Sequence, residues 1–81
     1  MHLRELTLAD IQRIQKERLY LLLQEAGTVR HLAFMLDTPV GTVNGWIERG
    51  RISKVGARKV EQHPTLGIKF SAYDLRPDMQ I

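Results

Sequence analysis

Residues Leu36–Trp46 read LDTPVGTVNGW, and they contain a break between two helical patterns. Asp37–Pro39 interrupts the hydrophobic periodicity, and proline is well placed at the first position of the helix that follows. Thr38 can cap that helix, because its side chain can accept a hydrogen bond from a backbone amide of the first turn. The sequence therefore predicts a helix over 29–36, a short turn, and a second helix over 39–49 that stops at the following glycine.

The apolar residues of these two helices predict how they pack together. At ~100° per residue, each helix has one hydrophobic face. The faces comprise Val29, Leu32, Ala33 and Leu36 in the first helix and Val43, Trp46 and Ile47 in the second. Ala33 is small enough to let the helices approach closely, and Trp46 is expected in the core rather than stacked on a base. Two short helices joined by such a turn are the helix-turn-helix pattern.

A longer helical pattern precedes this pair. Thr7 can cap a helix over 8–26, which would be roughly 28 Å long. Its apolar surface is wider than one stripe because of Tyr20, Leu21 and Leu23. We expect this surface either to contact a second subunit or to pack under the C-terminal segment. Residues 1–18 are an extra N-terminal helical segment and a candidate dimer contact.

The C-terminal third of the chain is predicted to hold one more helix and a short extended segment. Ser53 can cap a helix over about 54–63 that buries Val55 and Val60. Residues 67–70 read as extended, and a single helical turn or bend follows them. The predicted fold class is therefore all-α, with four to five helices and one short extended C-terminal segment.

Length and composition exclude several classes of protein. Residues 1–81 are enough for a single domain, and so small a core makes a partner subunit plausible. The lack of cysteine excludes disulfides, and His2, His31 and His63 lack the spacing of a metal site. No apolar run approaches the ~20 residues of a membrane span, and the start has no signal-peptide pattern. We expect a cytoplasmic protein without a cofactor and without a membrane contact.

Positive charge is concentrated in the segment that contains the two short helices. Residues 28–59 carry six basic and two acidic side chains, whereas residues 1–27 are neutral overall and residues 60–81 carry −1. A localised basic patch is the electrostatic footprint of a polyanion partner, although many solvated surfaces are also basic. The residues predicted to contact DNA phosphates are Thr28, Arg30, His31, Arg49, Arg51, Lys54 and Arg58.

Three segments carry a resemblance to a known family. They are LLLQEAGTVRHLAFML at 21–36, VNGWIERGRI at 43–52 and DLRPDM at 74–79, of which the last is the most specific. From about Leu19 to Met79 the chain resembles the small Cro-type phage repressors and the YdaS-like proteins, which are described as antitoxins. The resemblance implies a lambda-repressor-like helix-turn-helix domain that binds operator DNA as a dimer and represses transcription.

The second short helix departs from the family pattern where polar side chains usually touch bases. The candidates for base contact here are Val40, Gly41, Thr42, Asn44 and Gly45. Val40 can meet a thymine methyl group, Asn44 can pair with adenine, and Thr42 can contact a base or a phosphate. The two glycines cost ~1 kcal/mol each in a helix interior. They either let the backbone sit deeper in the groove or reflect drift on an unused face.

Two other classes of function bear on this sequence. As an alternative, the chain could be a protein-interaction module, such as an antitoxin that docks a partner through the apolar first helix and Phe34. An enzyme is not expected, because Ser53 and Ser71 sit at predicted helix caps and neither a triad spacing nor a GxxxxGK phosphate loop occurs. The expected partners are therefore double-stranded DNA and a second copy of the chain, with a protein partner as the alternative.

Overall fold

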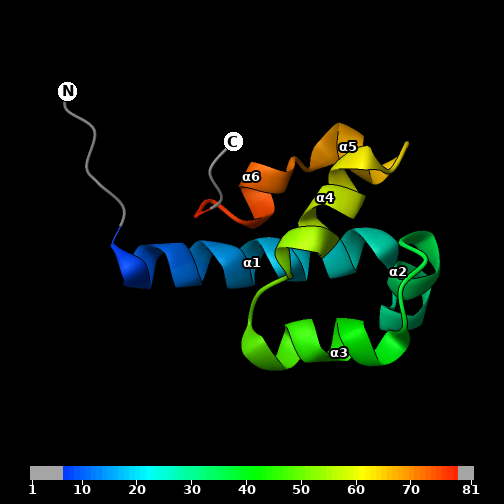
Figure 1. Cartoon of the computed structure of the whole chain (residues 1–81), viewed down its shortest axis with the longest axis horizontal. Coiled ribbons are helices and arrows are strands. Elements are labelled where there is room, and N and C mark those ends of the chain that lie inside the picture. Colours follow the sequence, from blue (N-terminus) through cyan, green and yellow to red (C-terminus); the bar gives the residue numbers. More distant parts are fainter. Residues whose placement is uncertain (1–6, 79–81) are drawn as a thin grey trace.

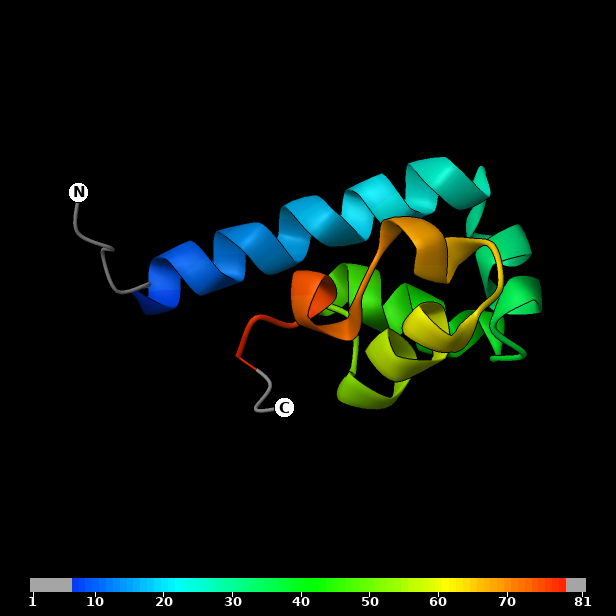
Figure 2. The ribbon, with the colours of Figure 1, turned by 90° about the horizontal axis from the view of Figure 1, so that it is seen from above.

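One long helix and five shorter ones make up residues 7–78, the part of the chain that the computed structural model describes (Figure 1). They are α1 (Leu8–Ala26), α2 (Val29–Met35), α3 (Val40–Arg49), α4 (Lys54–Gln62), α5 (Leu66–Lys69) and α6 (Ala72–Leu75). α1 and α3 run across the molecule, and α2 lies between them at one end. α4, α5 and α6 form a group beside α1 (Figure 2). The described residues are thus all-helical.

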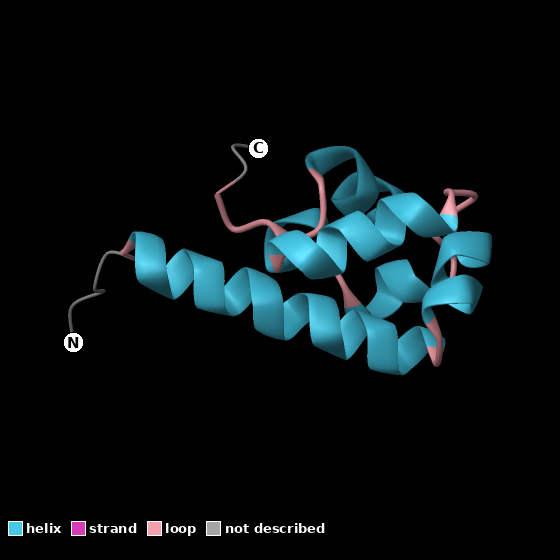
Figure 3. Cartoon of the chain, turned by 90° about the horizontal axis from the view of Figure 1, so that it is seen from below, coloured by secondary structure: helices cyan, strands magenta, loops and turns pink. Residues whose placement is uncertain are grey.

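The N-terminal helix begins and ends where its sequence predicts. The Thr7 hydroxyl accepts a hydrogen bond from the Asp10 amide, and the Asp10 carboxylate accepts one from the Thr7 amide, both at 3.1 Å. Gly27 ends the helix with a φ of +96°. Leu19 is fully buried, whereas Leu8 in the first turn is 71% exposed. The helix is longer than the core that it covers, so its first turns project past the other helices (Figure 3).

The turn over 36–39 joins α2 to α3, but its cap differs from the prediction. Thr38 does not cap α3: Pro39 occupies the N-cap position, and no side chain bonds to the first turn. The Thr38 hydroxyl donates instead to the Leu36 carbonyl at 3.0 Å and accepts from Lys59 Nζ at 3.2 Å. Threonine therefore holds the turn itself and connects it to α4.

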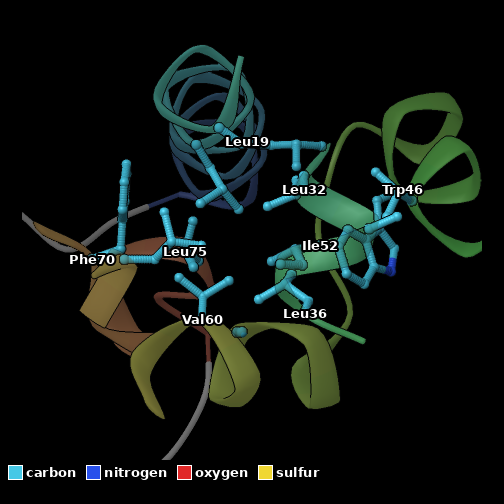
Figure 4. Close-up of a cluster of buried hydrophobic side chains, with 14 of the residues drawn as sticks. Leu19, Leu32, Leu36, Trp46, Ile52, Val60, Phe70 and Leu75 are labelled. Carbon is cyan, nitrogen blue, oxygen red and sulfur yellow. The ribbon is translucent and has the colours of Figure 1, made fainter. Parts of the chain in front are cut away.

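A hydrophobic core lies between α1, α2, α4 and α6, with α3 packed against one side of it (Figure 4). Its large buried side chains include Leu19, Leu32, Leu36, Trp46, Ile52, Val60, Phe70 and Leu75. Trp46 is only 1% exposed, which confirms that it is a core residue. Its ring packs on the backbone of Gly56, where a Cβ would lie 2.5 Å from Cζ2. The absence of a side chain at Gly56 therefore brings α4 into direct contact with α3.

α4 begins at its predicted cap but turns a different face to the core. The Ser53 hydroxyl accepts the Gly56 amide at 3.0 Å. Gly56, Ala57 and Val60 are buried, whereas Val55, which is predicted to be buried, is 67% exposed. Residues five apart lie about 140° apart around a helix, so one narrow face cannot bury both valines.

The segment predicted to be extended forms a helical turn instead. Leu66–Lys69 is the short helix α5, and only Phe70 after it is extended, with φ −129° and ψ 128°. A Cβ on Gly67 would overlap the Glu61 carbonyl oxygen, so this turn packs directly on the end of α4. Leu66 and Phe70 are both buried, and a helical turn brings residues four apart onto one side. Packing on α4 thus overrides the local pattern, and the helix count rises to six.

The C-terminal residues tie α1 to the loop between α3 and α4. Arg76 is 7% exposed, and its Nη1 donates to the Ile52 carbonyl oxygen at 3.0 Å. Its Nε and Nη2 donate to the Asp78 carboxylate at 2.9 and 2.7 Å, and Gln15 Nε2 donates to the same carboxylate at 3.0 Å. The hydrogen bonds from Arg76 lower the pKa of Asp78 from 3.8 to about 2. This charged pair therefore fixes the loop relative to α1.

Candidate functional site

The exposed side of α3 carries the residues predicted to contact bases. Val40 is 40% exposed, Gly41, Thr42 and Asn44 are exposed, and Gly45 is half-buried. Thr42 is exposed although its helical angle lies toward the core side. All five residues are therefore at least partly exposed, with Gly41, Asn44 and Gly45 on the side of α3 that faces away from the core and Val40 and Thr42 at its margins.

Neither glycine on this side of α3 is required by the packing of the chain. A Cβ on Gly41 would meet no atom within 4 Å. A Cβ on Gly45 would meet only the Arg49 guanidinium, with Nη1 3.2 Å away. Arg49 therefore reaches back along α3 over Gly45, which places positive charge on the exposed side of the helix.

Basic side chains gather at the C-terminal end of α3, around two surface grooves. The α3–α4 groove, about 330 Å³ in volume, includes Arg49, Arg51 and Lys54 in its lining. The α1–α3 groove, about 520 Å³, is lined by Arg49 and Arg51 together with Lys16 from α1. We call Lys16, Arg49, Arg51 and Lys54 the cation cluster. Sequence reasoning missed Lys16, because only the packing of α1 beside the end of α3 brings it there.

The other residues predicted to contact phosphate line neither of the two grooves. Thr28, Arg30 and His31 are at the start of α2. The Thr28 hydroxyl accepts the His31 amide at 3.0 Å, and the His31 ring donates to the last carbonyl of α1 at 2.7 Å. Arg30 is exposed, and Arg58 is exposed on α4 but lines neither groove. Of the seven predicted residues, three therefore line the grooves, three lie at the start of α2, and Arg58 lies one turn beyond Lys54 on α4.

The local charge balance favours an anion at the cation cluster. Neither groove has a carboxylate among its lining residues. Of the ion pairs within residues 7–78, Arg13–Asp10 and Lys69–Glu25 lie elsewhere. Arg76, which lines the α3–α4 groove, is already paired with Asp78. Glu48 is exposed on the same side of α3 as Asn44, so it is an acidic group that would oppose an anion there.

Large apolar side chains are also exposed away from α3, and those of α2 and α1 bear on the alternative function. Phe34 of α2 is 81% exposed, and its ring stacks on His31 with 6.5 Å between the ring centroids. On α1, Tyr20 and Leu21 are 46% and 45% exposed, whereas Leu23 packs against the core. The widened apolar surface of α1 is therefore divided between the core and a solvent-facing part that a partner could cover.

Residues 7–78 contain no group of three histidine, aspartate or glutamate side chains placed to hold a metal ion. None of their helices has the length and the apolar character needed to cross a bilayer.

Comparison with known proteins assigns no family to the chain. No family of known proteins, no curated protein and no solved structure matches it. The candidate site therefore rests on geometry and charge alone: an exposed side of α3 that carries Asn44 and two glycines, and a cation cluster at the end of that helix.

Proposed function

We propose that this chain is a sequence-specific DNA-binding regulator of transcription, in which α2 and α3 act as a helix-turn-helix and α3 enters the major groove. The observation that carries the proposal is the small-residue side of α3 with grooves at its end whose charged lining residues are all basic. A single α-helix fits the major groove of B-DNA, and the cations beside it would contact the phosphates. A lambda-repressor-like fold and a Cro-like repressor role are part of this proposal.

Base recognition in this proposal depends on few side chains. Val40 meets a thymine methyl group, and Asn44 donates to and accepts from an adenine edge. Thr42 contacts a base or the adjacent phosphate. Gly41 and Gly45 contribute by their lack of a side chain, because the α3 backbone can then lie closer to the base edges.

Affinity in this proposal comes mainly from phosphate contacts. In this proposal Arg49, Arg51 and Lys54 contact the DNA backbone at one end of α3, and Arg30 contacts it from the start of α2. Each phosphate neutralised adds about 0.9 to the slope of log affinity against log salt concentration. Binding should therefore weaken steeply as salt rises.

A dimer is the second part of the proposal, and α1 supports it. The first turns of α1 project beyond the other helices, and Leu8 on them is 71% exposed. Pairing of two copies through these turns would cover apolar surface that the chain itself leaves open. Two copies on one face of the duplex would place their α3 helices about 34 Å apart.

The test combines selection of bound fragments from random duplex DNA with salt titration of the selected sequence. Joint replacement of Arg49→Glu and Arg51→Glu should abolish binding or lower the salt slope by about 2. Arg18→Glu reverses one charge on α1, outside the cation cluster, and should leave the slope nearly unchanged. Selection of no sequence, or equal binding by the double variant and the Arg18 control, would contradict the proposal.

A second candidate function is a protein-interaction module, and the exposed apolar residues favour it. Phe34 and Leu21 together offer aromatic and aliphatic surface on α2 and α1. Binding through such surface is insensitive to salt, unlike binding to phosphates. Leu21→Asp should then abolish a complex that survives high salt, while the Arg49 and Arg51 reversals should leave it intact.

A further inference from the structure

The α1–α3 groove differs from the rest of the cation cluster because its cations come from two separate elements. Lys16 lies on α1, whereas Arg49 and Arg51 lie at the end of α3 and just beyond it. Gln12 and Gln15 complete the lining with Gly50, so the charged groups of the lining are all basic. A groove with this lining is suited to an anion that accepts hydrogen bonds from several directions.

The walls of this groove are fixed relative to each other. Gln15 is 2% exposed, and its Nε2 donates to the Asp78 carboxylate at 3.0 Å. Asp78 in turn pairs with Arg76, which donates to the Ile52 carbonyl beside Arg51. The spacing between α1 and the loop after α3 is therefore set by these buried and partly buried hydrogen bonds, and the groove exists before a ligand binds.

Stabilisation of the C-terminal end of α3 does not by itself explain why Lys16, Arg49 and Arg51 lie together. A helix C-terminus favours positive charge, and Arg49 lies in the last turn of α3. The carbonyls of Trp46 and Ile47, however, already accept the amides of Arg51 and Gly50, at 3.0 and 3.1 Å. Stabilisation of the helix end therefore does not require a third cation from α1.

Arg49 connects the groove to the side of α3 that is proposed to read bases. The same side chain lines the groove and places its guanidinium over Gly45. An anion in the groove would thus lie next to a duplex bound by α3. The backbone phosphates at the edge of the major groove are the anions in that position.

We infer that the α1–α3 groove holds a backbone phosphate of the bound duplex, with Lys16 as its contact from α1. The inference rests on the proposed function and adds α1 to the DNA-binding surface. Arg49 and Arg51 contact the phosphate from one wall, and Lys16 contacts it from the other. A phosphate contacted by both α1 and α3 fixes the position of α3 along the DNA major groove. A contact from α3 alone would not do so.

The test compares Lys16→Gln with Arg18→Gln, two single charge losses on exposed residues of α1. Lys16→Gln should lower the salt slope of DNA binding by about 0.9, and Arg18→Gln should leave it unchanged. Urea unfolding of both variants should match that of the unchanged protein, because neither residue contributes to the core. Equal slopes for the two variants, in a protein that binds DNA, would overturn the inference and leave the proposed function standing.

A second measurement separates DNA phosphate from a free anion. Inorganic phosphate is titrated into the unchanged protein and into Lys16→Gln while backbone amide signals near Arg51 are followed by NMR. Weak or absent shifts at millimolar phosphate, with the slope change above, support the DNA contact. Saturable phosphate binding that Lys16→Gln removes, with no change in the DNA slope, would make the groove a free-anion site and overturn the inference. Failure of the unchanged protein to bind any duplex would remove the proposed function itself.

Discussion

Gly56 and Gly67 are packed tightly against their neighbours, whereas Gly41 and Gly45 are not. A Cβ on Gly56 would lie 2.5 Å from an indole carbon, and one on Gly67 would overlap a carbonyl oxygen of α4. A Cβ on Gly41 would meet nothing within 4 Å, and one on Gly45 would meet only the tip of Arg49. All four are glycines in helices, but their surroundings differ.

The difference separates residues that the fold requires from residues that it does not. Glycine in a helix interior costs ~1 kcal/mol relative to alanine. In α4 and α5 this cost is offset by close packing of helices, which needs the missing side chain. On the exposed side of α3 nothing within residues 7–78 offsets it, so a role in contact with a partner is the physical explanation that the proposed function supplies.

The largest expected effect is at the packed position in α4. Gly56→Ala should lower the free energy of unfolding by about 3 kcal/mol, because neither the Trp46 ring nor the Ile52 side chain near it can move without disturbing the core. Urea unfolding followed by tryptophan fluorescence measures the change. Unchanged stability would mean that α4 can shift away from α3 at little cost.

A double variant tests whether the contact with Trp46 causes the loss of stability in Gly56→Ala. Trp46→Phe removes the indole carbons that approach Gly56, and it also removes a buried Nε1 that has no hydrogen-bond partner in the described chain. Combined with Gly56→Ala, it should therefore recover part of the lost stability, which circular dichroism can follow without tryptophan. Additive losses from the two changes would locate the strain elsewhere.

The second prediction concerns the effect of acid on the Arg76–Asp78 pair. This pair belongs to the part of the molecule that is fixed by its own packing. Because the Arg76 guanidinium lowers the pKa of Asp78 to about 2, the stabilisation is fully present above about pH 4. It is lost as the pH falls from about 4 to about 2. The carboxylate is partly solvated, so we expect about 1 kcal/mol in the free energy of unfolding. Asp78→Asn should flatten this dependence, whereas Glu17→Gln on exposed α1 should not.

The sequence predicts features that depend on neighbouring residues, and it does not predict contacts that only folding brings together. The bounds of α2 and α3 follow from Thr28, Pro39 and Gly50, because caps and breakers act on adjacent residues. The tight contacts of Gly56 and Gly67, by contrast, were not predicted, because each depends on an atom brought close only by folding. Helix α5 was missed for this reason.

The candidate site shows the same limit. The exposed side of α3 follows from helical periodicity for Gly41, Asn44 and Gly45, whereas the exposure of Thr42 does not follow from its helical angle. Lys16 could not be found in this way, since it joins Arg49 and Arg51 only through the packing of α1. Lys54 lines a groove whereas Arg58, one turn further along α4, does not, and this difference also depends on the orientation of α4, which charge counting along the chain does not provide.

The third prediction moves to the exposed side of α3. Gly45→Ala should raise the free energy of unfolding by somewhat less than 1 kcal/mol, because the gain in helix propensity is reduced by displacement of the Arg49 guanidinium. DNA affinity should fall, since the added methyl group occupies the space next to the bases and moves a phosphate contact. Thermal unfolding and DNA titration of the same preparation measure both. A stabilised variant with unchanged affinity would indicate that α3 does not approach DNA at Gly45.

The smallest effect on stability, and the clearest one for the comparison, is expected at Gly41. Because this residue lies in the first turn of α3 with open space around it, Gly41→Ala should stabilise the fold by only about 0.5 kcal/mol. If the backbone lies against a duplex, the extra methyl group should cost roughly tenfold in affinity, from ~1–3 kcal/mol of overpacking. Opposite signs for stability and affinity would mean that a partner, and not the fold, requires the glycine. If Gly41→Ala binds DNA with the same affinity as the unchanged protein, Gly41 lies on a surface that contacts no partner.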